Sequence, residues 1–402
     1  MSAGPSPVSA GAVRRVFDAL LPARRHLVAH DSRTIERQVT LAEIAAPTGG
    51  EAARAATVQR QLLALGLASS IDDAGNVVAR RGGTSDLPPV VICAHLDTVF
   101  GTDVCHQVTR KGDRLSGPGI GDNARGVAAM LAIADAFGAC EVRTRRPIVF
   151  AATTGEEGSG NLRGARHLFA TSAADAHCAI ALDGAGDERV VTHALGTRRF
   201  RIRFTGPGGH SWAAFGVANA VHAASQLSAQ LTLLPLPTAP RTTLTVSRIG
   251  GGSAINAIPA EAFLEVDVRS TSASHIDRLE DDLRDAAHRI LAWHNRQRRH
   301  GSPPLEMTID VVGERPGGAV AADAFVAHAA FDATRLVGRT PDGAIASTDA
   351  NVPLHLGIPA VAIGAGGRGG DVHTPREWFE NRDGALGIVR AMTIVAATAE
   401  LA

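Results

Sequence analysis

The stretch PPVVICAHLDTVF, residues 88–100, joins an apolar run to two polar side chains, His95 and Asp97. Unbroken apolarity is typical of a strand that helices cover on both faces. Side chains two positions apart in a strand point to the same side, so His95 and Asp97 would leave the strand end together. One side chain can then bind a ligand while the other holds it in place. A single His-x-Asp pair is more often structural, so this interpretation depends on the rest of the chain.

Similar apolar runs recur along the chain, at residues 147–153 (PIVFAAT), 178–183 (CAIALD) and 359–366 (PAVAIGAG). Helical patterns lie between them, at residues 123–137 and 158–170. This alternation of buried strands and helices predicts an α/β domain with a mostly parallel central sheet flanked by helices.

The middle of the chain has a different pattern. RRFRIRF (198–204) alternates apolar residues with arginines, and AEAFLEVDVRS (260–270) alternates likewise, which indicates strands with one face in water. Residues 273–296 follow as an amphipathic helix. We therefore expect a small α+β domain inserted into the α/β domain. The predicted boundaries are 1–194 for the first part of the α/β domain, 195–312 for the insertion and 313–402 for the second part of the α/β domain.

Composition excludes several classes of function. Lys plus Arg and Asp plus Glu both number 40, so the chain lacks the charge excess typical of nucleic-acid or membrane-surface binding. A small-molecule substrate fits better. Tyrosine is absent. The four cysteines form no CxxC pair, which argues against a zinc ribbon or a dithiol redox motif. The first residues contain no apolar signal-peptide core, and no apolar run is long enough for a membrane span, so a cytoplasmic location is expected.

Histidines and carboxylates follow several of the predicted buried strands. Open α/β sheets bind their ligands at the carboxyl ends of the strands, so we expect these side chains to lie close together. Zn²⁺ takes imidazole and carboxylate ligands, and two ions can share one bridging carboxylate. The pattern predicts a two-metal site with positions left open for water. The residues are His95, Asp97, Asp122, Glu156, Glu157, Asp183 and His373.

Each of these residues also has a structural interpretation. Asp183 could cap a helix, the Glu156–Glu157 pair could be a solvated acidic pair, and His373 could be a surface-loop histidine. The GPGIGD stretch, residues 117–122, is superficially similar to a phosphate-binding loop, but it lacks the Gly-Lys-Ser/Thr of a P-loop. The conjunction of these residues at several strand ends favours the metal site.

The ordered motifs AHLDTV, GPGIGDNARGV, TTGEEGSGN, ALDG, GPGGHSW, GGSAINAIP and VHTPREWFE resemble the M20 family of co-catalytic zinc metallopeptidases and amidohydrolases. The resemblance covers essentially the whole chain. It implies a zinc-exopeptidase fold whose inserted domain is a lid and, in many members, a dimerisation domain. It also implies two divalent metal ions, Zn²⁺ first, with Co²⁺ or Mn²⁺ as alternatives because nitrogen and oxygen ligands accept all three.

The resemblance further implies a role for each residue of the site. His95, Asp122 and Asp183 would hold one ion, and Asp122, Glu157 and His373 the other. Asp97 would orient His95 as an outer-shell carboxylate. Glu156 would be the general base on a metal-bound water and would return the proton to the leaving amine.

The inserted domain would contribute to substrate handling. His210, in GPGGHSW, would stabilise the tetrahedral oxyanion, often from the partner subunit, unless it is simply a turn histidine. Asn256 and Arg269 match positions that contact the substrate in the M20 family, although Arg269 could instead form a structural ion pair. The arginine-rich face of residues 198–204, interpreted as an edge strand able to pair across a two-fold axis, predicts a homodimer through the lid.

The stretches STDAN (347–351) and GGRGGDVHTPREW (366–378) are most similar to the peptidase T-like branch. The expected activity is that of a two-metal exopeptidase of the aminopeptidase type acting on di- or tripeptides. The alternative is an N-acyl-amino-acid amidohydrolase or a carboxypeptidase G-like enzyme with the same site. A non-catalytic binding protein on this fold is a third possibility, against which Glu156 and the complete ligand set argue.

Overall fold

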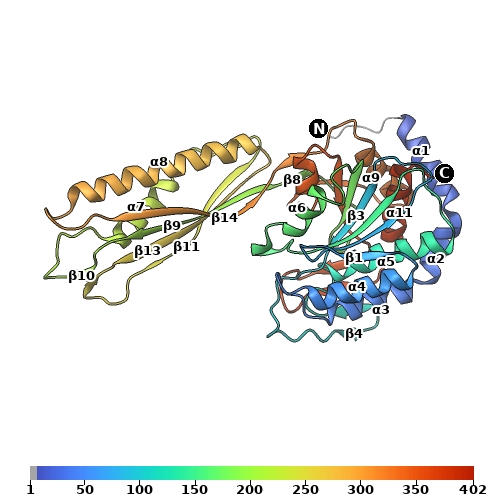
Figure 1. Cartoon of the computed structure of the whole chain (residues 1–402), viewed down its shortest axis with the longest axis horizontal. Helices are drawn as coiled ribbons and strands as arrows, with labels where there is room; N and C mark the ends of the chain where they lie inside the picture. Colours follow the sequence, from blue (N-terminus) through green and yellow to red (C-terminus); the bar gives the residue numbers. More distant parts are fainter. Residues whose placement is uncertain (1–6) are drawn as a thin grey trace. The chain divides into compact units, whose positions relative to one another are not determined.

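The structure is a computed structural model that describes residues 7–402 of the 402-residue chain. The chain forms two compact units (Figure 1). One is Leu195–Gly318, and the other contains the chain up to Ala194 and from Ala319 onwards. We call them the inserted unit and the catalytic unit.

The catalytic unit is built on a mixed sheet with strand order β1-β2-β6-β3-β7-β17-β8-β15, in which β16 also pairs with β8. The neighbours β6, β3, β7 and β17 are parallel, whereas β2 joins β6, and β8 joins β17, in antiparallel fashion. The prediction of an α/β fold with a mostly parallel central sheet is confirmed. The strands are β1 (Ser69–Ile71), β2 (Val77–Arg81), β3 (Val90–His95), β6 (Ile148–Thr153), β7 (Cys178–Leu182), β8 (Arg189–Ala194), β15 (Gly318–Ala319), β16 (Asp342–Ala346) and β17 (Ala360–Ile363).

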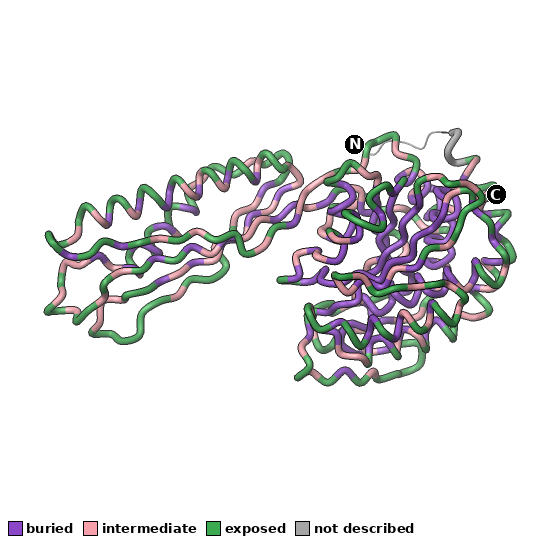
Figure 2. Tube along the Cα trace, viewed as in Figure 1, coloured by how far each residue is buried: buried purple, intermediate pink, exposed green. Residues whose placement is uncertain are grey.

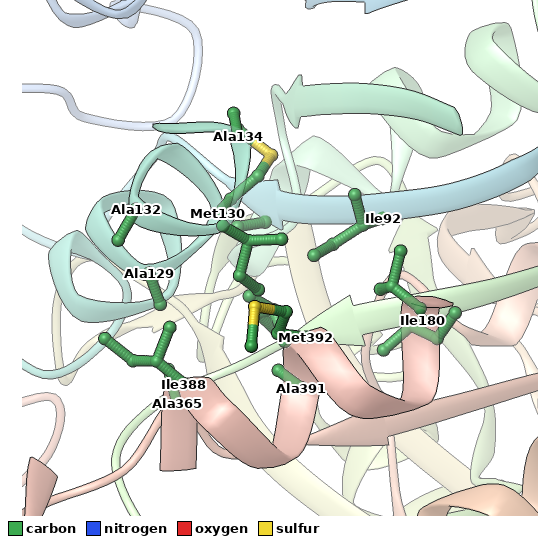
Figure 3. Close-up of a cluster of buried hydrophobic side chains, with 14 of the residues drawn as sticks. Ile92, Ala129, Met130, Ala132, Ala134, Ile180, Ala365, Ile388, Ala391 and Met392 are labelled. Carbon is green, nitrogen blue, oxygen red and sulfur yellow. The ribbon is translucent and has the colours of Figure 1, made fainter. Parts of the chain in front are cut away.

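Two helical layers explain why these strands are apolar throughout. Every residue of β3 and β6 is buried (Figure 2). Ile92 of β3 packs in one cluster with Met130 and Met392 (Figure 3), whereas its neighbour Val91 packs in another cluster with Phe169. The helices of this unit are α1 (Pro7–Ala19), α2 (Leu21–Ala29), α3 (Asp31–Ala42), α4 (Ala52–Ala64), α5 (Ala124–Ala139), α6 (Arg163–Ala170), α9 (Phe325–Leu336), α10 (Asn351–His355) and α11 (Gly384–Thr398), with a 3₁₀ turn, η1 (Gly158–Gly160).

A small antiparallel sheet in the catalytic unit has the order β18-β19-β5-β4. The loop between β18 and β19 carries His373, which has a positive φ of 63°. The strands are β4 (Thr109–Lys111), β5 (Arg114–Ser116), β18 (Arg368–Gly370) and β19 (Trp378–Glu380).

The inserted unit is an antiparallel sheet with the order β11-β13-β9-β14, packed against α7 and α8 through its own apolar core. β10 and β12, which lie between β9 and β13 in the sequence, form a separate two-stranded antiparallel sheet. The elements are β9 (Gly196–Thr205), β10 (Gly209–His210), α7 (Ala220–Leu231), β11 (Thr242–Gly251), β12 (Ala257–Ile258), β13 (Glu261–Ser270), α8 (Ala273–Gln297) and β14 (Glu306–Arg315).

The interpretation of residues 198–204 as an edge strand is wrong. These residues belong to β9, which lies between β13 and β14, so its backbone is already paired on both sides. Its arginines form cross-strand ion pairs: Arg201 lies 2.6 Å from Glu265, and Arg198 lies 2.7 Å from Glu314. Strands β11 and β14 are the edges of this sheet. The alternating pattern identified the two faces of the strand correctly but not its neighbours.

Within residues 7–402, none of the helices combines the length and the apolarity that crossing a membrane requires.

Candidate metal centre

The predicted ligands meet at one edge of the catalytic sheet. His95 is the last residue of β3, Asp183 follows β7, and Glu157 lies in the loop after β6. Because β3, β6 and β7 are parallel, their carboxyl ends lie side by side. Asp122 directly precedes Asn123, the N-cap of α5, and His373 comes from the β18–β19 loop.

Asp122 lies at the centre of this arrangement. Its Oδ1 is 3.0 Å from Nε2 of His95, and its Oδ2 is 3.1 Å from Nε2 of His373. His373 Nε2 is also 2.8 Å from Oε1 of Glu157. Two ligand atoms of one tetrahedral Zn²⁺ are separated by about 3.3 Å, so these spacings fit a metal site.

Three groups of side chains place one ligand atom each within 4.8 Å of one another: His95 with Asp122 and Asp183, Asp122 with Glu157 and His373, and His95 with Glu156 and Glu157. The first two groups are the sets that the family resemblance implies. They share Asp122, and all their donors are imidazole nitrogens and carboxylate oxygens, the chemistry that suits Zn²⁺, Co²⁺ or Mn²⁺. The residues therefore fit two divalent ions.

The close packing of carboxylates and imidazoles shifts the pKa values of several of these side chains. Burial and the nearby charge of Asp122 raise the pKa of Asp183 to about 7, and burial also raises the pKa of Glu157. The contact with Asp122 raises the pKa of His373 to about 9. Against the effect of burial, the contacts with His373 and His95 lower the pKa of Asp122. Bound cations would favour the ionised form of every carboxylate here.

Asp97 lies beside His95, as expected from the sequence, but its main contacts are different. Nδ1 of His95 is 3.0 Å from the backbone carbonyl oxygen of Asp97, whereas the carboxylate is 3.7 Å away. Because a carbonyl only accepts hydrogen bonds, Nδ1 of a neutral His95 carries the proton and Nε2 presents its lone pair on the side of Asp122. The backbone of Asp97 therefore fixes the ring in a metal-binding tautomer.

The carboxylate of Asp97 binds the turn after β6. It accepts the backbone N–H groups of Glu156 and Glu157, each at 2.9 Å. Asp97 is fully buried. Burial alone would raise its pKa, but the contact with His95 and the two amide hydrogen bonds lower the pKa to about 2. Asp97 is thus a permanent anion that connects the end of β3 with the Glu156–Glu157 turn.

Two residues that the sequence analysis missed hold Asp122 in place. Glu377 is fully buried and accepts the backbone N–H groups of Gly119, Gly121 and Asp122 at 2.8–3.1 Å. Asn123 donates to the carbonyl oxygen of Leu182, and its Oδ1 accepts from Gly184 at 3.1 Å, which ties α5 to the end of β7. Their positions in the motifs HTPREW and GDNARG were available signals.

His210, Asn256 and Arg269 belong to the inserted unit, whereas the metal-ligand set belongs to the catalytic unit. His210 is exposed, and its Nδ1 accepts the backbone N–H of Trp212 at 3.2 Å. The backbone N–H of Ser211 donates to the carbonyl oxygen of Asn256 at 2.9 Å, so the two segments are neighbours. Arg269 lies 2.7 Å from Asp267. This ion pair is the structural role that the sequence analysis gave as the alternative to substrate binding.

A cavity of about 830 Å³ adjoins the ligand set within the catalytic unit. This volume is in the range of small-molecule binding sites. Asp122 and Asp183 form part of its wall, and most of its other side chains are charged or polar. They include Asp187, Glu188, Arg189, Arg339, Arg368 and Arg382, together with Trp378.

Comparison with known proteins supports the family resemblance. The model of peptidase family M28 matches residues 76–232, and the M20 peptidase dimerisation domain matches residues 192–295. The chain is 28% identical to carboxypeptidase G2 from Pseudomonas sp. over 221 residues, 53% of this chain. The match spans 51% of carboxypeptidase G2, about half of that enzyme.

Two solved structures have the same fold. Aminopeptidase PepT from Bacillus cereus has a TM-score of 0.75 and 22% identity, covering 92% of this chain and 99% of that chain. The YXEP protein from Bacillus subtilis, a dinuclear metal binding peptidase from the M20 family, has a TM-score of 0.67 and 17% identity. That comparison covers 92% of this chain and 98% of that chain.

The chain thus combines an α/β unit, whose strand ends gather candidate metal ligands, with an insertion that matches a peptidase dimerisation domain. The fold is M20 peptidase-like, and the two family-model matches agree with the resemblance to the M20 family seen in the sequence.

Proposed function

We propose that the chain is a co-catalytic two-metal hydrolase that cleaves the amide bonds of small peptides, with the specificity of an aminopeptidase. The observation that carries this proposal is the pair of three-residue ligand groups that share Asp122. A shared carboxylate spaces two ions closely enough to act on one substrate. Glu156 lies next to the ligand Glu157 in the same turn, where a base is needed.

Two Zn²⁺ ions are the proposed cofactors, with Co²⁺ or Mn²⁺ as functional substitutes. When bound, they polarise the scissile carbonyl and lower the pKa of water. His95, Asp122 and Asp183 would hold one ion, and Asp122, Glu157 and His373 would hold the other. The contact of His95 Nδ1 with the carbonyl oxygen of Asp97 and the backbone contacts of Glu377 support this assignment because they hold His95 and Asp122 in place.

Glu156 is the proposed general base. It takes a proton from the attacking water and then delivers it to the nitrogen of the leaving amine, contributing roughly 10²–10⁴-fold to the rate. Glu156 is buried, and the hydrogen bond from its backbone N–H to Asp97 holds it beside the ligands. An ionised Asp97 keeps this arrangement throughout the neutral pH range.

The cavity beside Asp122 and Asp183 supports peptides as substrates. Its wall is rich in charged and polar side chains, which suits the polar backbone and charged ends of a di- or tripeptide better than a long aliphatic acyl group. The PepT structure is that of an aminopeptidase, and carboxypeptidase G2 is named for the opposite end of the peptide. N-acyl amino acids and carboxypeptidase substrates are therefore the alternatives.

The inserted unit supplies the proposed oxyanion donor and the proposed dimer interface. Because Nδ1 of His210 accepts a backbone N–H, a neutral His210 carries its proton on Nε2, which can donate to an oxyanion. The match to a peptidase dimerisation domain supports a homodimer. We propose that His210 serves the site of the partner subunit and that Asn256 contacts the substrate.

A substrate panel tests this function. Free-amino di- and tripeptides, N-acylated amino acids and peptides with a blocked amino terminus are assayed after loading with Zn²⁺ or Co²⁺. Release of the first residue from free-amino peptides supports the aminopeptidase. Hydrolysis restricted to N-acyl amino acids, or release of the last residue from blocked peptides, contradicts it in favour of an alternative.

A further inference from the structure

The segment Ala46–Glu51, which precedes α4, packs against the turn that carries Glu156 and Glu157. The backbone N–H of Thr98 donates to the carbonyl oxygen of Ala46 at 2.9 Å, which anchors the start of this segment just beyond β3. At its other end, Glu51 is buried, and its Oε1 accepts the backbone N–H of Gly155 at 3.1 Å. Both ends of the segment are therefore held in place, one by Thr98 and the other by Gly155.

Thr48 makes the contact nearest the ligands. Its hydroxyl donates to Oδ2 of Asp97 at 2.9 Å, and its oxygen lies 3.4 Å from the carbonyl oxygen of Glu157. The same Oδ2 accepts the backbone N–H of Glu157 at 2.9 Å, while Oδ1 accepts that of Glu156. The Thr48 hydroxyl thus restrains the rotation of the buried Asp97 carboxylate. That carboxylate in turn positions Glu156 and Glu157 through their backbone amides.

This geometry suggests a specific consequence of losing the hydroxyl. The Asp97 carboxylate accepts two backbone amides and the Thr48 hydroxyl, and the hydroxyl shares Oδ2 with the amide of Glu157. Without the Thr48 donor, the buried Asp97 carboxylate loses one of its charge-assisted hydrogen bonds. The carboxylate can then rotate, and the backbone amides of Glu156 and Glu157 that bind it move as well. The displaced groups would be the Glu157 ligand and the Glu156 base, because both belong to this turn.

We propose that Thr48 is a positioning residue of the metal centre, acting through Asp97 to fix the turn that carries Glu156 and Glu157. The inference rests on the proposed function, since it takes Glu157 as a metal ligand and Glu156 as the base. Thr48 itself touches neither ligand atoms nor substrate in this account. Its effect is on the placement of two other side chains.

The test compares Thr48→Val, which keeps the shape but removes the donor, with Thr48→Ser, which keeps the donor. Thr40→Val is the matched control, because Thr40 is exposed and its hydroxyl donates within α3, to the carbonyl oxygen of Glu36. Metal affinity is measured by competition with a chromophoric chelator, the Co²⁺-loaded proteins are compared by visible absorption, and kcat and KM are measured on a cleaved peptide.

Thr48→Val is expected to weaken binding of the second ion and to lower kcat, each by about tenfold, the usual cost of losing an outer-shell partner. The Co²⁺ spectrum should change and KM should stay within about twofold. Thr48→Ser and Thr40→Val should resemble the wild type. Thr48→Ala removes the same donor and repeats the test if the valine variant folds poorly.

A Thr48→Val protein that matches Thr40→Val in affinity, spectrum and kcat overturns the inference, and so does a Thr48→Ser protein as impaired as Thr48→Val. Failure of the proposed function is distinguishable from either result. If the wild type cleaves no peptide of the panel, the proposed function fails, whereas chelator competition and the Co²⁺ spectrum still decide the role of Thr48.

Discussion

The Oδ2 atom of Asp122 lies 3.1 Å from Nε2 of His373, which comes from a loop 251 residues further along the chain. The other oxygen of the same carboxylate faces His95 at 3.0 Å. One side chain therefore contacts both histidines of the ligand set. In the proposed centre Asp122 would therefore be a ligand shared by both ions.

Replacement of Asp122 by alanine should weaken both ions together, because each loses a ligand. We expect fewer than one tightly bound Zn²⁺ per chain after dialysis, measured by elemental analysis. Asp135→Asn is the control, since Asp135 pairs with Arg33 and Arg37 away from the site, and it should keep both ions. A variant at Asp122 that retains two tightly held ions would remove the bridge from the mechanism.

Metal affinity should rise with pH. The raised pKa of Asp183, about 7, means that the metal-free carboxyl is protonated below that pH, and the raised pKa of His373, about 9, extends proton competition further. Each competing proton lowers apparent affinity by up to about tenfold per pH unit below its pKa. Calorimetric titration with Zn²⁺ at pH 6, 7 and 8, in buffers of different ionisation enthalpy, measures affinity and proton release. Affinity that stays constant over this range would contradict the assignment of both ligands.

The packing of α11 against the loop before β18 should be intolerant of any side chain at Gly387. A Cβ atom there would overlap the backbone of Gly366. We expect Gly387→Ala to lower the free energy of unfolding by about 1–3 kcal/mol, measured by urea denaturation. Gly138→Ala in α5 is the matched control, since a Cβ atom there meets nothing within 4 Å, and it should be neutral or stabilise by up to about 1 kcal/mol. Equal stability of the two variants would contradict the observed packing.

Two inactive chains should restore activity when mixed, if His210 acts across the proposed dimer. A Glu156→Ala chain lacks the base, and a His210→Ala chain lacks the oxyanion donor. In a heterodimer, one of the two composite sites receives both intact groups, so activity should recover to about half the wild-type value per heterodimer. Peptide cleavage after confirmed subunit exchange is the measurement. No recovery would mean that His210 acts within its own chain or not at all.

The sequence predicted the parallel core and the meeting of the candidate ligands at one edge of the sheet, because both leave local patterns. Buried strands such as β3 are continuous apolar runs, and the polar residue at the end of each lies where ligands bind. It could not predict that the backbone of Asp97 fixes His95 while its carboxylate holds the Glu156–Glu157 turn. That division depends on side-chain rotation and on Thr48, about fifty residues earlier in the chain, so no spacing rule reveals it.

The inserted unit shows a second limit of sequence patterns. The alternation in residues 198–204 states which side chains share a face, but strand neighbours depend on pairings with distant segments. Strand β9 therefore proved to be internal, and its arginines pair with acidic residues of β13 and β14 rather than facing a partner.

The central claim is that Glu156 is a base and not a ligand, while its neighbour Glu157 is a ligand. The most direct measurement determines metal content and peptide turnover on the same sample of Glu156→Ala, with Glu157→Ala as the matched control. We predict that Glu156→Ala keeps two ions per chain and loses roughly 10²-fold or more in kcat, because only the proton transfer is removed. Glu157→Ala should lose an ion. A Glu156→Ala protein that loses a metal ion, or that retains wild-type turnover with both ions bound, would contradict the proposed mechanism.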